Sequence, residues 1–153
     1  MSERASCEKI GTITFSRLFE TIKGVTDMPV IVQKFGGSSL ASIKHIMRVA
    51  ATVAETRNRG YQVAVVVSAM AGETDRLLGL AREIAEQPSG REQDALVATG
   101  EQVSAALMAM ALESLNCPAR SFTGLQLPLL TDETHTRAHI LDLPTQKLRQ
   151  TLD

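Results

Sequence analysis

The chain has 153 residues, of which 44% are hydrophobic and 22% charged, and its formal net charge is −1. A chain of this size can bury a core of its own and needs neither disulfides nor a structural metal, so one ordinary globular domain is expected. Balanced charge, no Trp and a single Tyr argue against the basic surface and stacking platform of a nucleic-acid-binding protein. Two cysteines, Cys7 and Cys117, are too few for a disulfide framework and fit a reducing compartment.

Export and membrane insertion are not expected from the sequence. No apolar stretch approaches the roughly 18 residues needed to span a bilayer. Charged residues interrupt the N-terminal region throughout, so it lacks the apolar centre of a signal peptide. The expected location is the cytoplasm, with no membrane partner.

Residues 1–27 differ in pattern from the rest of the chain. They mix charges evenly, contain one weak amphipathic stretch, and are followed by a second possible start at Met28. We interpret residues 1–27 as an N-terminal extension, disordered or helical, and residues 28–153 as the domain itself. The alternative is an N-terminal helix that packs on the core through Leu18, Phe19 and Ile22.

After the extension the pattern alternates between strand and helix. Residues 30–35 are a short apolar run stopped by two glycines, which predicts a buried strand. An amphipathic helix should follow, capped by Ser39 or Ser42 and ended by Gly60. Residues 63–67 show no polar alternation and predict a second strand, covered on both faces.

Further helices and one more strand are expected downstream. A second helix is broken at residues 88–90, and a third helical region covers residues 91–116. Gly100 lies inside that region, where glycine costs about 1 kcal/mol relative to alanine, so a bend or break is expected there. A third strand is predicted at residues 119–123, and a short terminal helix from Thr145.

This order of elements predicts the α/β class, with three layers (α/β/α) and a mainly parallel sheet. In such sheets ligands bind outside the carboxyl ends of the strands, where the loops and helix starts gather. The loops at residues 36–39, 68–74 and 123–132 are therefore the places where a functional site is expected.

The first of these loops has the composition of a polyphosphate site. The strand delivers Lys34 to its end, and Gly36, Gly37, Ser38 and Ser39 lead directly into a helix. Adjacent glycines let the backbone approach a ligand and adopt positive φ, and amides at a helix start favour an anion. The P-loop and Rossmann glycine patterns are absent, so phosphate would bind by another scheme. The alternative is a tight turn with a surface lysine.

Two further positions suggest a second ligand. The loop at residues 68–74 offers hydroxyls and amides that could hold a carboxylate, although a capped helix start explains it equally well. Glu101 stands beside the most apolar segment, where an unpaired carboxylate is costly, so it either reaches solvent or meets a cation such as a ligand ammonium. His135 and His139 are four apart, but no further ligands accompany them, so no metal site is predicted.

Three motifs, in this order and spacing, resemble the aspartate kinases, a branch of the amino-acid kinase superfamily. The resemblance covers about residues 28–142. The motifs are Lys34-Phe35-Gly36-Gly37-Ser38-Ser39-Leu40, the run from Val65 through Ser68 and Thr74 to Leu78, and Val97-Ala98-Thr99-Gly100-Glu101-Gln102-Val103-Ser104.

The resemblance implies an amino-acid kinase fold and transfer of the γ-phosphoryl group of ATP, with Mg2+, to the side-chain carboxylate of L-aspartate. The product, 4-phospho-L-aspartate, serves lysine, threonine and methionine synthesis. By position, Lys34 would be the catalytic cation and Glu101 would receive the substrate α-ammonium. The implied phosphate site comprises Lys34, Phe35, Gly36, Gly37 and Ser38, and the implied substrate site comprises Ser39, Ser68, Thr74 and Glu101.

The chain also departs from the family pattern. Aspartate kinases continue into a segment that completes the aspartate and metal site, an adenine-binding half and regulatory domains, so residues 28–153 are expected to be the N-terminal half of a truncated kinase domain. Pro128 is an unfamiliar residue in the third loop. We expect the chain alone to be inactive or barely active, and able to self-associate through the uncovered surface. The alternatives are a glutamate or acetylglutamate kinase and a truncated non-catalytic remnant.

Overall fold

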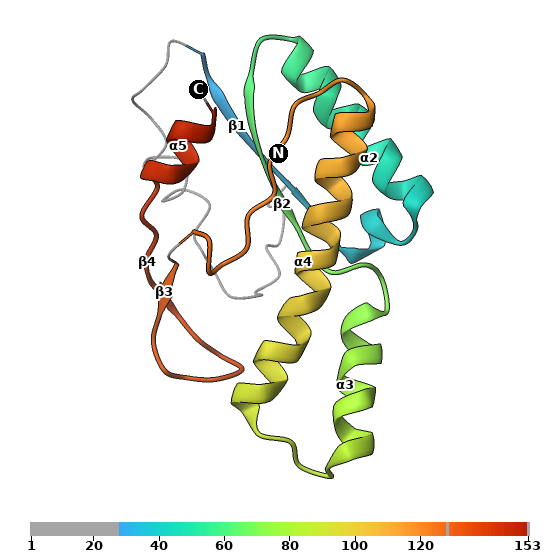
Figure 1. The fold of residues 1–153 in the computed structure, drawn as a ribbon, viewed down its shortest axis with the longest axis vertical. Helices are drawn as coiled ribbons and strands as arrows, with labels where there is room; N and C mark the ends of the chain where they lie inside the picture. The colour runs from blue at the N-terminus through green and yellow to red at the C-terminus, as the bar shows by residue number, and fades with distance from the viewer. Residues whose placement is uncertain (1–27, 128, 153) are drawn as a thin grey trace, which may run out of the picture.

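The structure is a computed structural model that describes residues 28–127 and 129–152, and the interpretation of residues 1–27 lies outside the described residues. Figure 1 shows helices arranged around two central strands. In chain order the elements are β1 (Val30–Phe35), η1 (Gly37–Leu40), α2 (Ile43–Asn58), β2 (Gln62–Val67), α3 (Glu73–Ile84), α4 (Gly90–Ser114), β3 (Leu130–Thr131), β4 (Ile140–Asp142) and α5 (Gln146–Leu152).

The strands β1 and β2 form a parallel pair, as predicted. Their register runs from Val30 opposite Gln62 to Phe35 opposite Val67, so both strands end at the same edge. The pairing continues one step further, because the Ser68 N–H donates to Phe35 O at 3.1 Å. The loops that follow the two strands therefore begin side by side.

The core lies between these strands and the helices α2 and α4. Helix α2 begins where Ser42 accepts a hydrogen bond from the His45 N–H, so Ser42 rather than Ser39 is the cap. Figure 1 shows α2 and α4 on one side of the strands and α5 on the other, which confirms the layered α/β class. The buried hydrophobic cluster is Leu40, Ile46, Val49, Ala50, Val53, Met108, Ala111, Leu112 and Cys117.

Helix α4 differs from the prediction at Gly100. It runs without a break from Gly90 to Ser114, so the expected interruption at Gly100 is wrong. The helix ends in a hydrogen-bonded cap instead. The Asn116 N–H donates to Glu113 O at 2.9 Å and the Cys117 N–H to Leu112 O at 3.0 Å, with Asn116 at φ 55°. Cys117 is buried.

The third predicted strand, at residues 119–123, is wrong: these residues have no regular secondary structure. A strand needs a neighbour whose free backbone groups it can bond. Within the described residues, the only strand partner of β2 is β1, and α5 packs beside β2. There the Gln62 side-chain amide donates to Leu152 O at 2.8 Å. Ala119 still packs against the core without being part of a strand.

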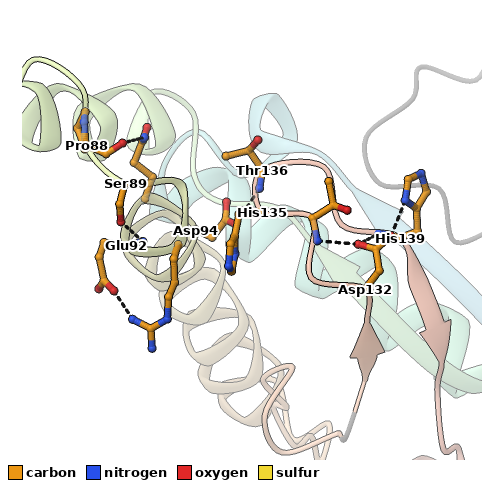
Figure 2. A network of polar contacts seen from close by, with 11 residues as sticks. Pro88, Ser89, Glu92, Asp94, Asp132, His135, Thr136 and His139 are labelled. Carbon is orange, nitrogen blue, oxygen red and sulfur yellow. Dashed lines mark hydrogen bonds and ion pairs between the residues drawn. The ribbon is translucent and has the colours of Figure 1, made fainter.

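Strands β3 and β4 pair antiparallel, in a stretch where the sequence indicated no regular element. The loop between them touches the first turns of α4, as Figure 2 shows. There Asp94 accepts the Thr136 N–H at 2.8 Å and lies 3.3 Å from His135 Nδ1. The hairpin is thereby attached to the start of α4. The predicted terminal helix is confirmed as α5.

Helix α4 is also the one helix among the described residues that is long and apolar enough to cross a membrane, judged by length and composition alone. The expectation that no segment is long and apolar enough to span a bilayer is therefore wrong, because α4 meets that test with a few polar residues in its span. Only 28% of its most apolar window is buried among the described residues, although Ser104, Met108 and Leu112 are buried and the helix packs against α2 and α3. A core helix passes the same test of length and composition, so the finding supports no membrane assignment.

Candidate active site

The candidate site lies at the edge where β1 and β2 end, and Lys34 is its cationic residue. Lys34 is exposed, one residue before the end of β1. Its Nζ lies 3.7 Å from the place that a Cβ atom on Gly36 would occupy, so the ammonium is turned toward the glycine turn. The neighbouring Phe35 is half-buried and packs against the core.

Neither glycine of the first turn has positive φ, and the close approach of another loop restricts side chains at Gly37 rather than at Gly36. Gly36 has φ −81°, and the described glycines with positive φ are Gly60 and Gly72, so the expectation of positive φ in this turn is wrong. A Cβ on Gly37 would lie 3.0 Å from Ala69 O and 3.6 Å from Ala71 N. A side chain at Gly37 would therefore require the second loop to move by a few tenths of an ångström.

The glycine turn leads into a single 3-10 turn rather than directly into a long helix. The Ser39 N–H donates to Gly36 O at 3.0 Å within η1, and α2 begins only at Ile43. A helix dipole therefore contributes less to anion binding at this turn than the sequence suggested. The Lys34 ammonium and the unobstructed backbone at Gly36 contribute more. Ser38 is exposed and Ser39 half-buried in this turn.

The second loop carries Ser68 at its start and Thr74 in the first turn of α3. The N-cap of α3 is Gly72, which has φ 79° and makes no side-chain cap bond, so the alternative of a Ser or Thr cap is wrong here. Thr74 is exposed and Ser68 is half-buried. Neither hydroxyl is used to cap α3, so both remain candidates for a ligand.

Helix α4 brings the third motif to the same place. Glu101 Oε1 accepts the Ala69 N–H at 3.1 Å. At the preceding residue, a Cβ on Gly100 would lie 3.0 Å from the Ala69 Cβ and 3.3 Å from the Glu73 Cγ. Gly100 is thus explained by close packing, and Ala69, only 4% exposed, is the point where all three motifs meet.

Of the two outcomes foreseen for Glu101, the structure shows the solvent-exposed one. The residue is exposed, and its described partner is the Ala69 backbone N–H rather than a side-chain cation. A carboxylate has about four acceptor positions on its two oxygens, so one N–H leaves most of them open to a ligand.

Sequence reasoning missed two residues of this region. Ala69 carries no chemical group, so composition could not reveal it. Glu73 forms a bidentate ion pair with Arg76. The Arg76 Nε donates to Glu73 Oε2 at 2.8 Å, and the Arg76 terminal nitrogen donates to Oε1 at 2.7 Å. This hydrogen bonding lowers the pKa of the Glu73 carboxyl. The spacing of three residues between Glu73 and Arg76 on a predicted helix is the sequence signal that indicates this ion pair.

The third loop, residues 123–132, does not share the contacts of the first two. Lys147 Nζ donates to Gln126 O at 2.9 Å, which ties the loop to α5. Asp132 accepts from the His139 ring at 2.8 Å (Figure 2), and this bond is the main reason that the pKa of Asp132 is lowered to about 2. Its described side-chain contacts lie within the hairpin, so it is not part of the candidate site.

A cavity of about 600 Å3 lies at the opposite end of β2, and none of the candidate residues lines it. Its walls include Tyr61, Gln62, Phe122 and Leu148. In parallel sheets ligands bind beyond the carboxyl ends of the strands, and this cavity is at the start of β2. We therefore place the candidate site at the edge with Lys34 rather than in the cavity.

Comparison with known proteins identifies relatives. The model of the amino acid kinase family matches residues 29–153. An aspartate kinase of Stutzerimonas stutzeri is 50% identical over 123 residues, covering 80% of this chain and 30% of the relative. The aspartokinase of Pseudomonas aeruginosa is 51% identical over 125 residues, covering 82% and 30%. The chain thus spans about 30% of the length of these curated relatives.

Solved structures of aspartate kinases also match this chain. The aspartate kinase from Synechocystis matches with a TM-score of 0.71 and 41% identity, over 79% of this chain and 20% of that chain. The E. coli aspartokinase III, solved in complex with aspartate and ADP, matches with a TM-score of 0.68 over 81% of this chain and 38% of that one. At 23% identity the second match concerns the fold alone.

Proposed function

The chain belongs to the amino acid kinase family, and from that premise we propose that it forms the phosphate- and acceptor-binding edge of an aspartate kinase. The reaction would move the γ-phosphoryl group of ATP to the side-chain carboxylate of L-aspartate, giving 4-phospho-L-aspartate. The observation that carries the proposal is the convergence of the three motifs on Ala69, with the Lys34 ammonium beside Gly36.

Lys34 would supply the charge that phosphoryl transfer needs. The transferring group spreads negative charge over its oxygens, so catalysis is mostly positioning and electrostatic stabilisation. The exposed Lys34 ammonium beside Gly36 would meet a phosphate that the amides of Gly36, Gly37 and Ser38 also bind. The Phe35 backbone would complete this phosphate site.

The acceptor would be held by hydroxyls and by one carboxylate. Ser39 stands on the first loop, Ser68 and Thr74 on the second, and Glu101 on α4. The exposed Glu101 carboxylate has spare acceptor positions for an α-ammonium group, as a free amino acid requires. Two relatives named as aspartate kinases, each about 50% identical, favour aspartate over glutamate or acetylglutamate.

Magnesium is implied by the family chemistry, but the described residues do not form a site for it. Among them no group of three or more His, Cys, Asp and Glu side chains could hold a metal ion. Mg2+ usually binds through one or two carboxylates together with the substrate phosphates. We therefore assign no step of the reaction to a metal held by this part of the chain.

We expect the chain by itself to be inactive or barely active. It spans about 30% of its relatives, and β1 pairs only with β2 among the described strands, which leaves its other edge for further strands or a second copy. An ATP-dependent enzyme of amino-acid metabolism would work in the cytoplasm.

The test is a chimera in which residues 29–153 replace the matched segment of the Pseudomonas aeruginosa aspartokinase. ADP release would be measured with aspartate, glutamate and N-acetylglutamate as acceptors. We expect activity with aspartate, a loss of about 100-fold in kcat for Lys34→Ala, and little change for Glu113→Ala, an exposed α4 control. Activity with glutamate but not aspartate would reassign the substrate. A folded chimera inactive on all three acceptors would indicate a non-catalytic remnant.

A further inference from the structure

The Glu101 carboxylate has a contact that ligand binding alone does not explain. Its Oε1 accepts the backbone N–H of Ala69, a residue of the loop after β2, 32 positions earlier in the chain. A side chain whose only task was to meet a ligand ammonium would not need this bond. The bond fixes the start of the second loop to α4.

Ala69 in turn touches the first loop. A Cβ on Gly37 would lie only 3.0 Å from Ala69 O, so the Ala69 carbonyl lies beside the Gly37 backbone with little room for a side chain between them. On its other side Ala69 rests against Gly100, where a Cβ would lie 3.0 Å from the Ala69 Cβ. Ala69 is therefore held between α4 and the glycine turn, and its N–H is held by Glu101.

We propose that Glu101 is a positioning residue for the phosphate loop. By fixing Ala69, the Glu101 carboxylate holds the Gly36-Gly37 turn in the position from which it receives phosphate, while its remaining acceptor capacity faces the second ligand. The identity of that ligand as aspartate rests on the proposed function. The effect on phosphate does not depend on which amino acid is the acceptor.

Two substitutions separate the charge of Glu101 from its hydrogen bond. Glu101→Gln removes the negative charge but keeps an oxygen that can accept the Ala69 N–H. Glu101→Ala removes the charge and the acceptor together. Because both variants lose the same charge, a difference between them reports the loss of the acceptor and of the side chain that carries it, and exchange at the Ala69 amide identifies the hydrogen bond. Glu113→Ala, on the same helix, controls for loss of an exposed glutamate.

The first measurement uses the 153-residue chain, with inorganic triphosphate as the probe. Hydrogen exchange at the Ala69 amide should be accelerated in Glu101→Ala and close to wild type in Glu101→Gln and Glu113→Ala. Triphosphate should bind Glu101→Ala about fivefold more weakly than Glu101→Gln, the factor that one ordinary hydrogen bond contributes. Equal exchange and equal affinity in the two Glu101 variants would overturn the proposal.

The second measurement compares, in the chimera, the KM for the acceptor with the KM for ATP. Glu101→Gln should raise KM for the acceptor and leave KM for ATP within about twofold, whereas Glu101→Ala should raise both, KM for ATP by about fivefold. A tether that merely kept the fold together would lower the folded fraction and leave KM for ATP unchanged. A chimera that phosphorylates no aspartate refutes the proposed function, and the triphosphate experiment then decides this inference by itself.

Discussion

The most direct structural prediction concerns Gly100. In a helix interior, alanine is more favourable than glycine by about 1 kcal/mol, so propensity alone predicts that Gly100→Ala stabilises α4. The structure predicts the opposite. The new Cβ would lie 3.0 Å from the Ala69 Cβ and 3.3 Å from the Glu73 Cγ, whereas carbon atoms pack best at about 3.5–4.0 Å.

The clash at Gly100 cannot be relieved by a side-chain rotation. The Ala69 Cβ is fixed to the loop backbone, and that backbone is held against Gly37, so the loop itself must shift. Overpacking of this kind costs about 1–3 kcal/mol, which equals or exceeds the propensity gain. We expect Gly100→Ala to destabilise the chain by up to about 2 kcal/mol.

Gly79 provides the matched control. It also lies inside a helix, α3, but a Cβ there would have nothing within 4 Å, so Gly79→Ala should stabilise the chain by about 1 kcal/mol. Urea unfolding of both variants, followed by circular dichroism, measures the difference. If Gly100→Ala stabilised the chain as much as Gly79→Ala does, α4 would not be packed against Ala69 and the reasoning would be wrong.

Three other predictions follow from described contacts. Gly37→Ala should weaken triphosphate binding by at least about tenfold, because its Cβ would meet Ala69 O at 3.0 Å and displace the turn; unchanged binding in a titration would disprove that contact. Because the pKa of Asp132 is lowered to about 2 from 3.8, mainly by the hydrogen bond from His139, the stabilisation from this pair is complete above pH 3.8 and is lost as the pH falls through about 2. A carboxyl NMR titration should find that midpoint and see it rise in His139→Ala; an unmoved midpoint would exclude His139 as the cause. Ser104→Ala should stabilise the chain by about 1 kcal/mol, since its hydroxyl is buried and has no hydrogen-bond partner among the described residues, and a loss of stability in urea would reveal a partner.

The sequence predicted local elements well where burial and pairing act together. The apolar run at residues 30–35 became β1, and the run at 63–67 lies within β2. Residues 119–123 lack such an apolar run and form no strand, since strand formation also requires a bonding partner that no local pattern reveals. The short β3–β4 hairpin depends on pairing across the chain and was missed for the same reason.

For the candidate site, the sequence identified the chemical groups but not how they are joined. Lys34 and Glu101 stand out by charge and context. Ala69 could not be found, because its role comes from its place between Gly37, Gly100 and Glu101. Gly100 was noticed and misinterpreted, because a glycine that allows close packing and a glycine that breaks a helix look alike in the sequence.

The central claim is that polyphosphate is received at the edge of the sheet beside Lys34. An NMR titration of the 153-residue chain with ATP, following the backbone amide signals, tests it most directly. The claim predicts that the signals of Gly36, Gly37 and Ala69 shift in wild type and stay in place in Lys34→Ala. Shifts confined to the lining of the opposite cavity, such as Tyr61, would contradict it.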